Sequence, residues 1–170
     1  MKKIIPVLLI ASMLVYISSC EKDDICVEGD TPQLVIGFFD IDDTTEAKEV
    51  PSLRIKEIVL DTVINTISDR SSSLDSIGVP LRSDVTSTAF AFITDSADDD
   101  DTGDETGNID TLTISYTLRE AFVSRACGYV INYDDLTVSL PASANNWIQD
   151  ITVVQEIVEN SNSIHVKIFF

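Results

Sequence analysis

The clearest evidence for the fold class is the segment Asp110-Thr111-Leu112-Thr113-Ile114-Ser115-Tyr116-Thr117-Leu118. Its even-numbered residues from Leu112 to Leu118 are apolar or aromatic, and its odd-numbered residues are Thr or Ser. Successive side chains of a β-strand point to opposite faces, so this alternation predicts a strand with one buried and one wet face. Antiparallel sheets that cover one side of a core have this pattern.

The neighbouring segments extend the predicted sheet. Residues 86–93 carry Thr88, Phe90 and Phe92 on one side, which predicts a partner strand for 110–118 with the acidic segment between them as a long hairpin loop. At the C-terminus, residues 151–158 and 164–170 flank a polar segment, which predicts a second hairpin.

Other short runs predict further strands. Residues 33–40 contain a continuous apolar run, which suits a central strand covered on both faces. Residues 53–63 fit a helix or a strand, but their β-branched residues favour a strand. With residues 77–81 and 130–138, these segments predict an all-β fold: a single antiparallel β-sandwich of seven or eight strands. An immunoglobulin-like arrangement is one form of it, although the Trp and Cys spacing of antibody domains is missing.

The N-terminus has the features of an export signal. Lys2 and Lys3 precede an apolar run that ends at Ile17 and is too short to span a bilayer comfortably. The segment Ile17-Ser18-Ser19-Cys20 resembles a lipobox, because Ile17 is too large for an ordinary cleavage site. The resemblance implies lipidation of Cys20 and cleavage before it, and two or more acyl chains anchor a protein stably. The alternatives are a chance Cys after a simple signal, or an uncleaved anchor.

The predicted organisation has three parts. Residues 1–19 form the signal peptide, residues 20–31 the lipidated Cys and its tether, and residues 32–170 the β-sandwich domain. The tether begins Glu21-Lys22-Asp23-Asp24, which resembles the acidic export signal of surface lipoproteins in the Bacteroidota. This resemblance implies display on the outer face of the outer membrane. A plain solvated linker on a periplasm-facing protein is the alternative.

Charge excludes one class of partner. Removal of the signal leaves 9 basic and 29 acidic residues, so the net charge is −20. Nucleic-acid binding needs basic patches that displace phosphate counterions, so no nucleic acid is expected as a partner. Docking of the domain on anionic headgroups is disfavoured for the same reason.

The cysteines predict a disulfide. With Cys20 lipidated, Cys26 and Cys127 remain as an even pair in an oxidising compartment. A bond between them would clamp the tether to the domain. The alternative is two free thiols.

Several segments together resemble a family of uncharacterised Bacteroidota lipoproteins. They are the lipobox, Cys26, and the segments 77–81, 125–129 and 165–170, with Cys127-Gly128-Tyr129 among them. The resemblance covers nearly all of residues 20–170. The family has no established activity, so it implies an address and no catalytic residue.

The acidic segment 98–105 is a candidate calcium site. Carboxylates are the ligands that calcium requires, and Asp99, Asp101 and Asp104 could converge around a turn at Gly103. The spacing does not match an EF-hand. A solvated loop without a built site is the alternative.

Catalysis has little support in the sequence. The sole histidine, His165, is predicted to face outward beside Lys167. No nucleophile elbow, phosphate loop or HExxH motif is present, so we predict no catalytic residues and no cofactor other than calcium. The 29 acidic residues leave open a carboxylate-dependent hydrolase acting on envelope glycans.

Aromatic residues suggest a binding surface. Tyr129, Tyr133 and Trp147 could form a platform for a sugar or peptide, or Trp147 could plug one end of the sandwich. The sequence therefore predicts a lipid-anchored binding or scaffolding protein whose partner is an envelope protein or polysaccharide. A hydrolase and a calcium-dependent structural module are the alternatives.

Overall fold

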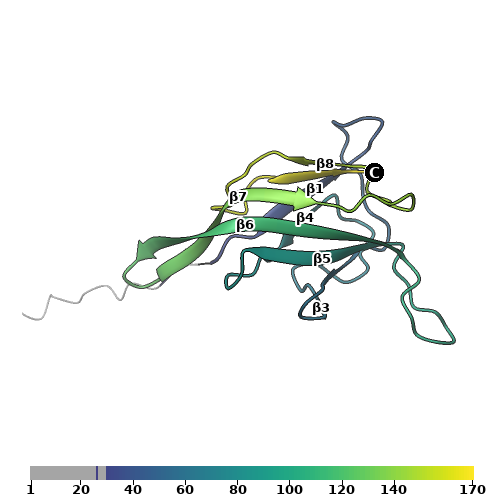
Figure 1. Ribbon diagram of the computed structural model, residues 1–170, viewed down its shortest axis with the longest axis horizontal. Coiled ribbons are helices and arrows are strands. Elements are labelled where there is room, and N and C mark those ends of the chain that lie inside the picture. The colour runs from purple at the N-terminus through teal and green to yellow at the C-terminus, as the bar shows by residue number, and fades with distance from the viewer. Residues whose placement is uncertain (1–25, 27–29) are drawn as a thin grey trace, which may run out of the picture.

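The computed structural model describes residue 26 and residues 30–170, and in this part the chain forms nine strands and no helix (Figure 1). No helix capable of crossing a membrane occurs among these residues. The predicted signal peptide, Cys20 and most of the tether lie outside them. The strands are β1 (Leu34–Phe39), β2 (Arg54–Glu57), β3 (Thr62–Val63), β4 (Ser76–Val79), β5 (Ser87–Thr94), β6 (Asn108–Ser124), β7 (Gly128–Ser139), β8 (Asp150–Val153) and β9 (Val166–Phe169).

The strands form two sheets, which confirms the predicted all-β sandwich, although the described residues form nine strands and not the predicted seven or eight. One sheet has the order β3-β2-β5-β6-β7 and is antiparallel throughout. The other has the order β4-β1-β9-β8, and in it β1 and β9 run parallel. The expectation of a purely antiparallel sandwich is wrong for this pair. Parallel strands need a long connection, and here nearly the whole domain separates β1 from β9.

Both predicted hairpins are present. β5 pairs with β6 from Ser87 opposite Ser115 to Thr94 opposite Asn108, and the acidic segment joins them. β8 pairs with β9, although both strands are shorter than predicted. The predicted strand 53–63 is divided into β2 and β3 by a turn. In that turn Asp61 has a positive φ of 54°, and the Glu57 carboxylate accepts the N–H of Leu60.

The core lies between the two sheets and follows the predicted alternation. The apolar residues of β6 from Leu112 to Tyr116 are buried, while the Thr and Ser residues between them are only partly covered. Phe90 and Phe92 of β5 and Ile55 of β2 are fully buried on the same side. The other sheet faces them with side chains from β1, β4 and β9: Leu34, Ile36, Phe38, Ile77, Val79, Val166 and Ile168.

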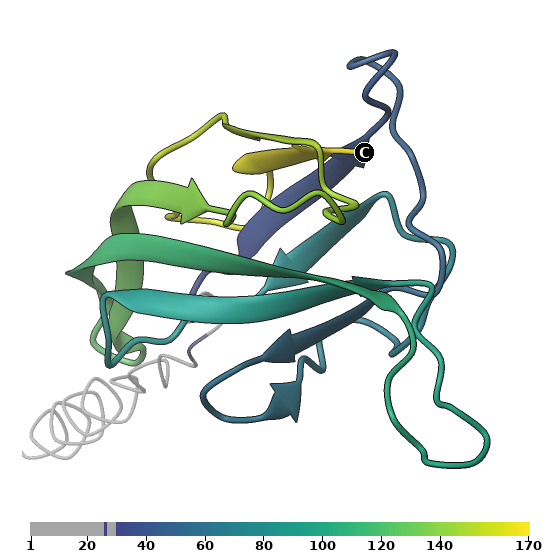
Figure 2. The ribbon, with the colours of Figure 1, turned by 45° about the vertical axis from the view of Figure 1, so that its right-hand side comes forward.

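The β6–β7 hairpin extends beyond one end of the sandwich. β6 has 17 residues and β7 has 12, and their turn projects from one end of the molecule (Figure 1). The loop between β5 and β6 projects from the opposite end, as the turned view confirms (Figure 2). The acidic loop and the β6–β7 turn are therefore at opposite ends of the domain.

His165 is buried, so the prediction that it faces outward is wrong. Its side chain is only 1% exposed, and its Nδ1 accepts the backbone N–H of Val35 at 3.1 Å. Its own N–H donates to the Val35 carbonyl at 2.9 Å. His165 precedes β9, where the chain is not yet extended, so the alternation of the strand does not set the direction of its side chain.

Replacing His165 with Ala should weaken the fold and change its pH dependence. The substitution leaves the Val35 N–H without its acceptor, which costs about 1–3 kcal/mol. Burial lowers the pKa of His165 below 6.5, so the unfolded chain binds more protons and stability falls as pH drops through that value. Between pH 7.5 and pH 5.5, the free energy of unfolding measured in urea should fall less for the variant than for the native protein. An equal loss in both would contradict a buried, neutral His165.

Candidate functional site

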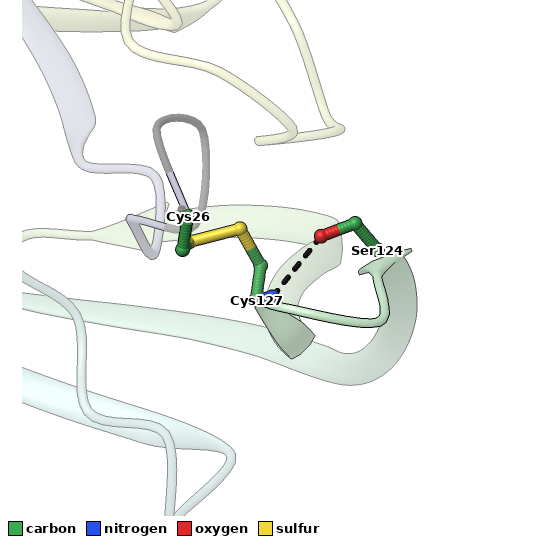
Figure 3. Close-up of a disulfide and its surroundings, with 3 residues drawn as sticks. All are labelled: Cys26, Ser124 and Cys127. Atoms are coloured by element: carbon green, nitrogen blue, oxygen red, sulfur yellow. Dashed lines mark hydrogen bonds between the residues drawn. A yellow bond between two sulfur atoms is a disulfide. The ribbon is translucent and has the colours of Figure 1, made fainter. Parts of the chain in front are cut away.

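The projecting hairpin carries the predicted disulfide. Cys26 and Cys127 are joined across a sequence separation of 101 residues (Figure 3). Cys127 lies in the β6–β7 turn, where its N–H donates to Ser124 Oγ at 3.0 Å. The bond therefore fastens the start of the chain's described part to the tip of the hairpin.

An exposed aromatic pair lies beside this turn. Phe122 and Tyr129 are opposite each other in the β6–β7 ladder, and their ring centroids are 5.4 Å apart. Their exposed fractions are 61% and 67%. Phe122 was absent from the sequence-based candidates because it lies beyond the alternating stretch. Its position near Cys127 in a hairpin was the signal that could have identified it.

Tyr133 lies in the core, so the predicted aromatic platform is wrong for this residue. Its ring is fully buried and packs edge-on against Tyr116 at 5.0 Å. Its hydroxyl donates to the carbonyl of Leu81 at 3.0 Å. Burial and the neighbouring Tyr116 raise the pKa of Tyr133 to about 12. Tyr133 therefore supports the core and offers no face to a ligand.

Trp147 is half-buried and does not present its ring as an exposed binding platform. Its Nε1 donates to the carbonyl of Phe92 at 3.1 Å, and its ring packs edge-on against Phe170 at 5.4 Å. It thus bridges a strand of one sheet and the C-terminal residue that follows the other sheet. This arrangement matches the alternative in which Trp147 plugs the sandwich, and it separates Trp147 from the pair at the hairpin.

The acidic loop uses one of its three candidate ligands to shape its own turn. Asp99 Oδ1 accepts the N–H groups of Asp101 and Thr102, each at 2.9 Å. These bonds and the Thr102 hydroxyl hold the pKa of Asp99 below its usual value. Asp101 and Asp104 are exposed. Within the described ranges, no three acidic, His or Cys side chains are placed to hold a metal ion, and calcium binding stays a prediction.

The base of the acidic loop is held by an ionic network. Glu105 Oε2 accepts from Ser96 Oγ at 2.8 Å and from Arg54 at 3.1 Å, while its Oε1 accepts the N–H groups of Ala97 and Gly107. Burial alone would raise the pKa of Glu105, but these hydrogen bonds lower it. Arg54 also forms a bidentate pair with Asp69. The network joins β2, the loop before β4 and the acidic loop.

Two carboxyl groups are buried at other positions. Asp110 accepts the N–H of Ile148 at 2.8 Å, and burial raises its pKa. Glu57 is 6% exposed and lies on β2, separated from Asp110 on β6 by strand β5. From the strand spacing and register, their α-carbons are about 12 Å apart. Asp110 thus fixes the segment before β8, and the two residues serve different parts of the fold.

Comparison with known proteins gives a match to a protein family. No curated protein matches the chain, and no solved structure does either. A family model described as "Family of unknown function (DUF6452)" matches residues 52–170, a range that contains β2 to β9 and the β6–β7 hairpin. The match covers well over half of the sequence. The chain therefore belongs to this family of unknown function.

Proposed function

We propose that the protein is a lipid-anchored binding or scaffolding protein of the outer membrane or cell surface, without catalytic activity. The observation that carries the proposal is the disulfide between Cys26 and Cys127. Cys26 follows the predicted lipidation site Cys20 by six residues, which span at most about 20 Å. The hairpin tip is then held within that distance of the membrane surface.

This attachment orients the domain. The β6–β7 turn and the acidic loop project from opposite ends of the domain (Figure 2). In the proposed orientation the turn faces the membrane and the acidic loop points away from it. Such an orientation suits a mature chain with a net charge of −20, because it moves the densest acidic segment away from anionic headgroups. The acidic end is left free for an envelope partner, either a protein or a polysaccharide.

The aromatic pair at the hairpin fits the same orientation. Phe122 and Tyr129 are exposed beside the disulfide. Without a contact to the membrane, their apolar rings would face water. Tyr129 carries a polar hydroxyl on an apolar ring, and such side chains favour positions where apolar and aqueous surroundings meet. We infer that this pair contacts the membrane interface or a membrane-embedded partner.

Substitution of Cys20 with Ala should release the protein from membranes. Without a thiol at the lipobox, no diacylglycerol is attached, so the stable anchoring that two or more acyl chains supply is lost. Fractionation of cells should move the variant from the membrane pellet to the soluble fraction. The matched control is the Cys26→Ser, Cys127→Ser double variant, which should stay in the pellet because it keeps Cys20. A Cys20→Ala protein that remains in the pellet would contradict the anchor.

Surface display and binding need their own test. Protease added to intact cells should cleave a surface-exposed domain, whereas protection until the outer membrane is opened would place it on the periplasmic face. Crosslinked membranes should yield a reproducible envelope partner, or a glycan array should give a specific signal. Failure of both would count against a binding role. Glycan turnover lost on a single Asp→Asn or Glu→Gln change would favour the hydrolase instead.

A further inference from the structure

The tip of the β6–β7 hairpin carries an apolar surface at the point where the tether is attached. Between the pair Phe122 and Tyr129 and the turn, the ladder holds one further pair, Ser124 opposite Gly128. Two residues of an extended strand span about 7 Å, so the two rings lie close to the turn. The turn holds Cys127, whose disulfide fastens the start of the described chain there (Figure 3). The exposed rings and the attachment point of the tether therefore share one end of the molecule.

The core of the sandwich does not use these rings. In β6 the last buried residue is Tyr116, and in β7 the first buried residue is Asn132. Phe122 and Tyr129 lie beyond both, where they pack edge-on against each other and stay exposed. Exposed apolar surface that the fold does not need marks a site of contact with a partner or a membrane. The rings can make such a contact without any change in the fold.

The charge of the hairpin tip differs from that of the rest of the chain. Residues 121–133 contain no Asp or Glu, although the chain has 29 acidic residues. Their one charged residue is Arg125, which is exposed in the turn. A carboxylate would lose hydration on entering a lipid interface, whereas an Arg keeps its charge there and pairs with phosphate. The tip can therefore approach a bilayer that the acidic part of the chain avoids.

The predicted anchor makes such a contact intramolecular. The chain between Cys20 and Cys26 spans at most about 20 Å, and Cys26 is joined to the tip. A short linker between two contacts gives an effective concentration in the millimolar range, so a weak second contact is populated once the first is made. The tip needs only modest affinity for lipid, and without the acyl chains it would not hold the protein on a membrane.

We propose that the β6–β7 tip is a second membrane contact, in which Phe122 and Tyr129 enter the boundary between headgroups and acyl chains and Arg125 pairs with a lipid phosphate. Apolar side chains of interfacial segments are buried by about 5–10 Å, which matches the distance between these rings and the turn. The Tyr129 hydroxyl stays among the headgroups. This inference rests on the lipid anchor of the proposed function, and it assigns the rings to the bilayer and not to a membrane-embedded partner.

Quenching of tryptophan fluorescence by brominated lipid tests the contact. The sole tryptophan, Trp147, is half-buried and donates to the Phe92 carbonyl near the acidic end, so the native protein should be quenched little. The lipidated protein is reconstituted in vesicles of phosphatidylcholine whose acyl chains are brominated close to the headgroup. In these vesicles Phe122→Trp should lose at least about half of the fluorescence that the added tryptophan gives in unbrominated vesicles.

Ile109→Trp is the matched control. Ile109 lies on the same strand, is 49% exposed and stands beside the acidic loop at the opposite end. Its added tryptophan should be quenched no more than the native protein. If the vesicles retain the protein but quench Phe122→Trp no more than Ile109→Trp, the anchor stands and this inference is overturned, which leaves a membrane-embedded protein as the partner of the rings. If the vesicles do not retain the native protein, the anchor and this inference fall together.

A second pair of variants shows whether the rings themselves make the contact. In the Phe122→Trp protein, Tyr129→Asp should reduce the quenching at least about twofold, because it places a carboxylate where the ring enters the interface. Ile109→Asp adds the same charge at the opposite end of β6 and should leave the quenching unchanged. Equal losses from the two aspartates would show a general effect of charge and contradict a contact made by the tip.

Discussion

Replacement of Cys26 and Cys127 with Ser should lower the free energy of unfolding by about 4–5 kcal/mol, the largest effect that we expect from any change outside the core. The bond closes a loop across a separation of 101 residues, and a cross-link over a loop of that size removes much of the entropy of the unfolded chain. Urea unfolding of the double variant gives this value directly.

The native protein treated with a reductant is the matched control. The reduced protein also lacks the cross-link, so it should unfold at the same urea concentration as the double variant. If the free energy of unfolding fell by less than about 1 kcal/mol, the disulfide would not be restricting the unfolded chain as expected. The double variant should also expose the tether to protease while it leaves the strands of the sandwich protected.

Replacement of Tyr133 with Ala should cost about 3–5 kcal/mol, as expected for deletion of a fully buried aromatic ring. Tyr133→Phe keeps the ring and removes only the hydroxyl, so it should cost about 1–3 kcal/mol through the unpaired carbonyl of Leu81. Thermal or urea unfolding of both variants separates the packing contribution from the hydrogen bond.

Tyr129→Ala is the control for this series. Tyr129 is an exposed tyrosine on the same strand, so its loss should change the unfolding free energy by no more than about 0.5 kcal/mol. If Tyr133→Ala were equally mild, Tyr133 would lie at the surface and not in the core. The two tyrosines therefore test the division between core and surface in β7.

The predictable part of the fold is where period-two alternation is unbroken. Residues 110–118 and 86–93 alternate cleanly, and their strands pair as expected. The Cys pairing followed from the count of cysteines once Cys20 is set aside for lipidation. In these places local pattern and covalent chemistry determine the structure.

The errors fall where that alternation breaks. Between Ser115 and Thr117 of β6, the facing strand β7 takes one extra residue, and Asp135 has a positive φ of 55°. This bulge reverses the faces of β7, so Tyr133 and Leu136 are both buried although they are three residues apart. No single-strand pattern predicts such a reversal.

The burial of the Glu57 carboxyl group could not be predicted from the sequence either. A glutamate in an alternating segment is expected to face water, since ionised side chains are rarely buried without a partner. Its burial depends on a turn in which its own carboxylate accepts the N–H of Leu60 and on a wall supplied by residues after β4. Both come from tertiary structure, so the burial of Glu57 follows only from the three-dimensional fold.

Mass spectrometry of the native protein, cut after arginine without reduction, tests the lipid anchor and the disulfide together. Cleavage at Arg54 and Arg125 leaves Cys20 and Cys26 on one fragment and Cys127 on another. We expect a fragment 20–54 that begins at Cys20, carries the mass of a diacylglycerol and a further acyl chain, and is disulfide-linked to fragment 126–170. An unmodified Cys20 within a fragment that begins elsewhere would contradict the lipid anchor, and with it the proposed orientation at the membrane.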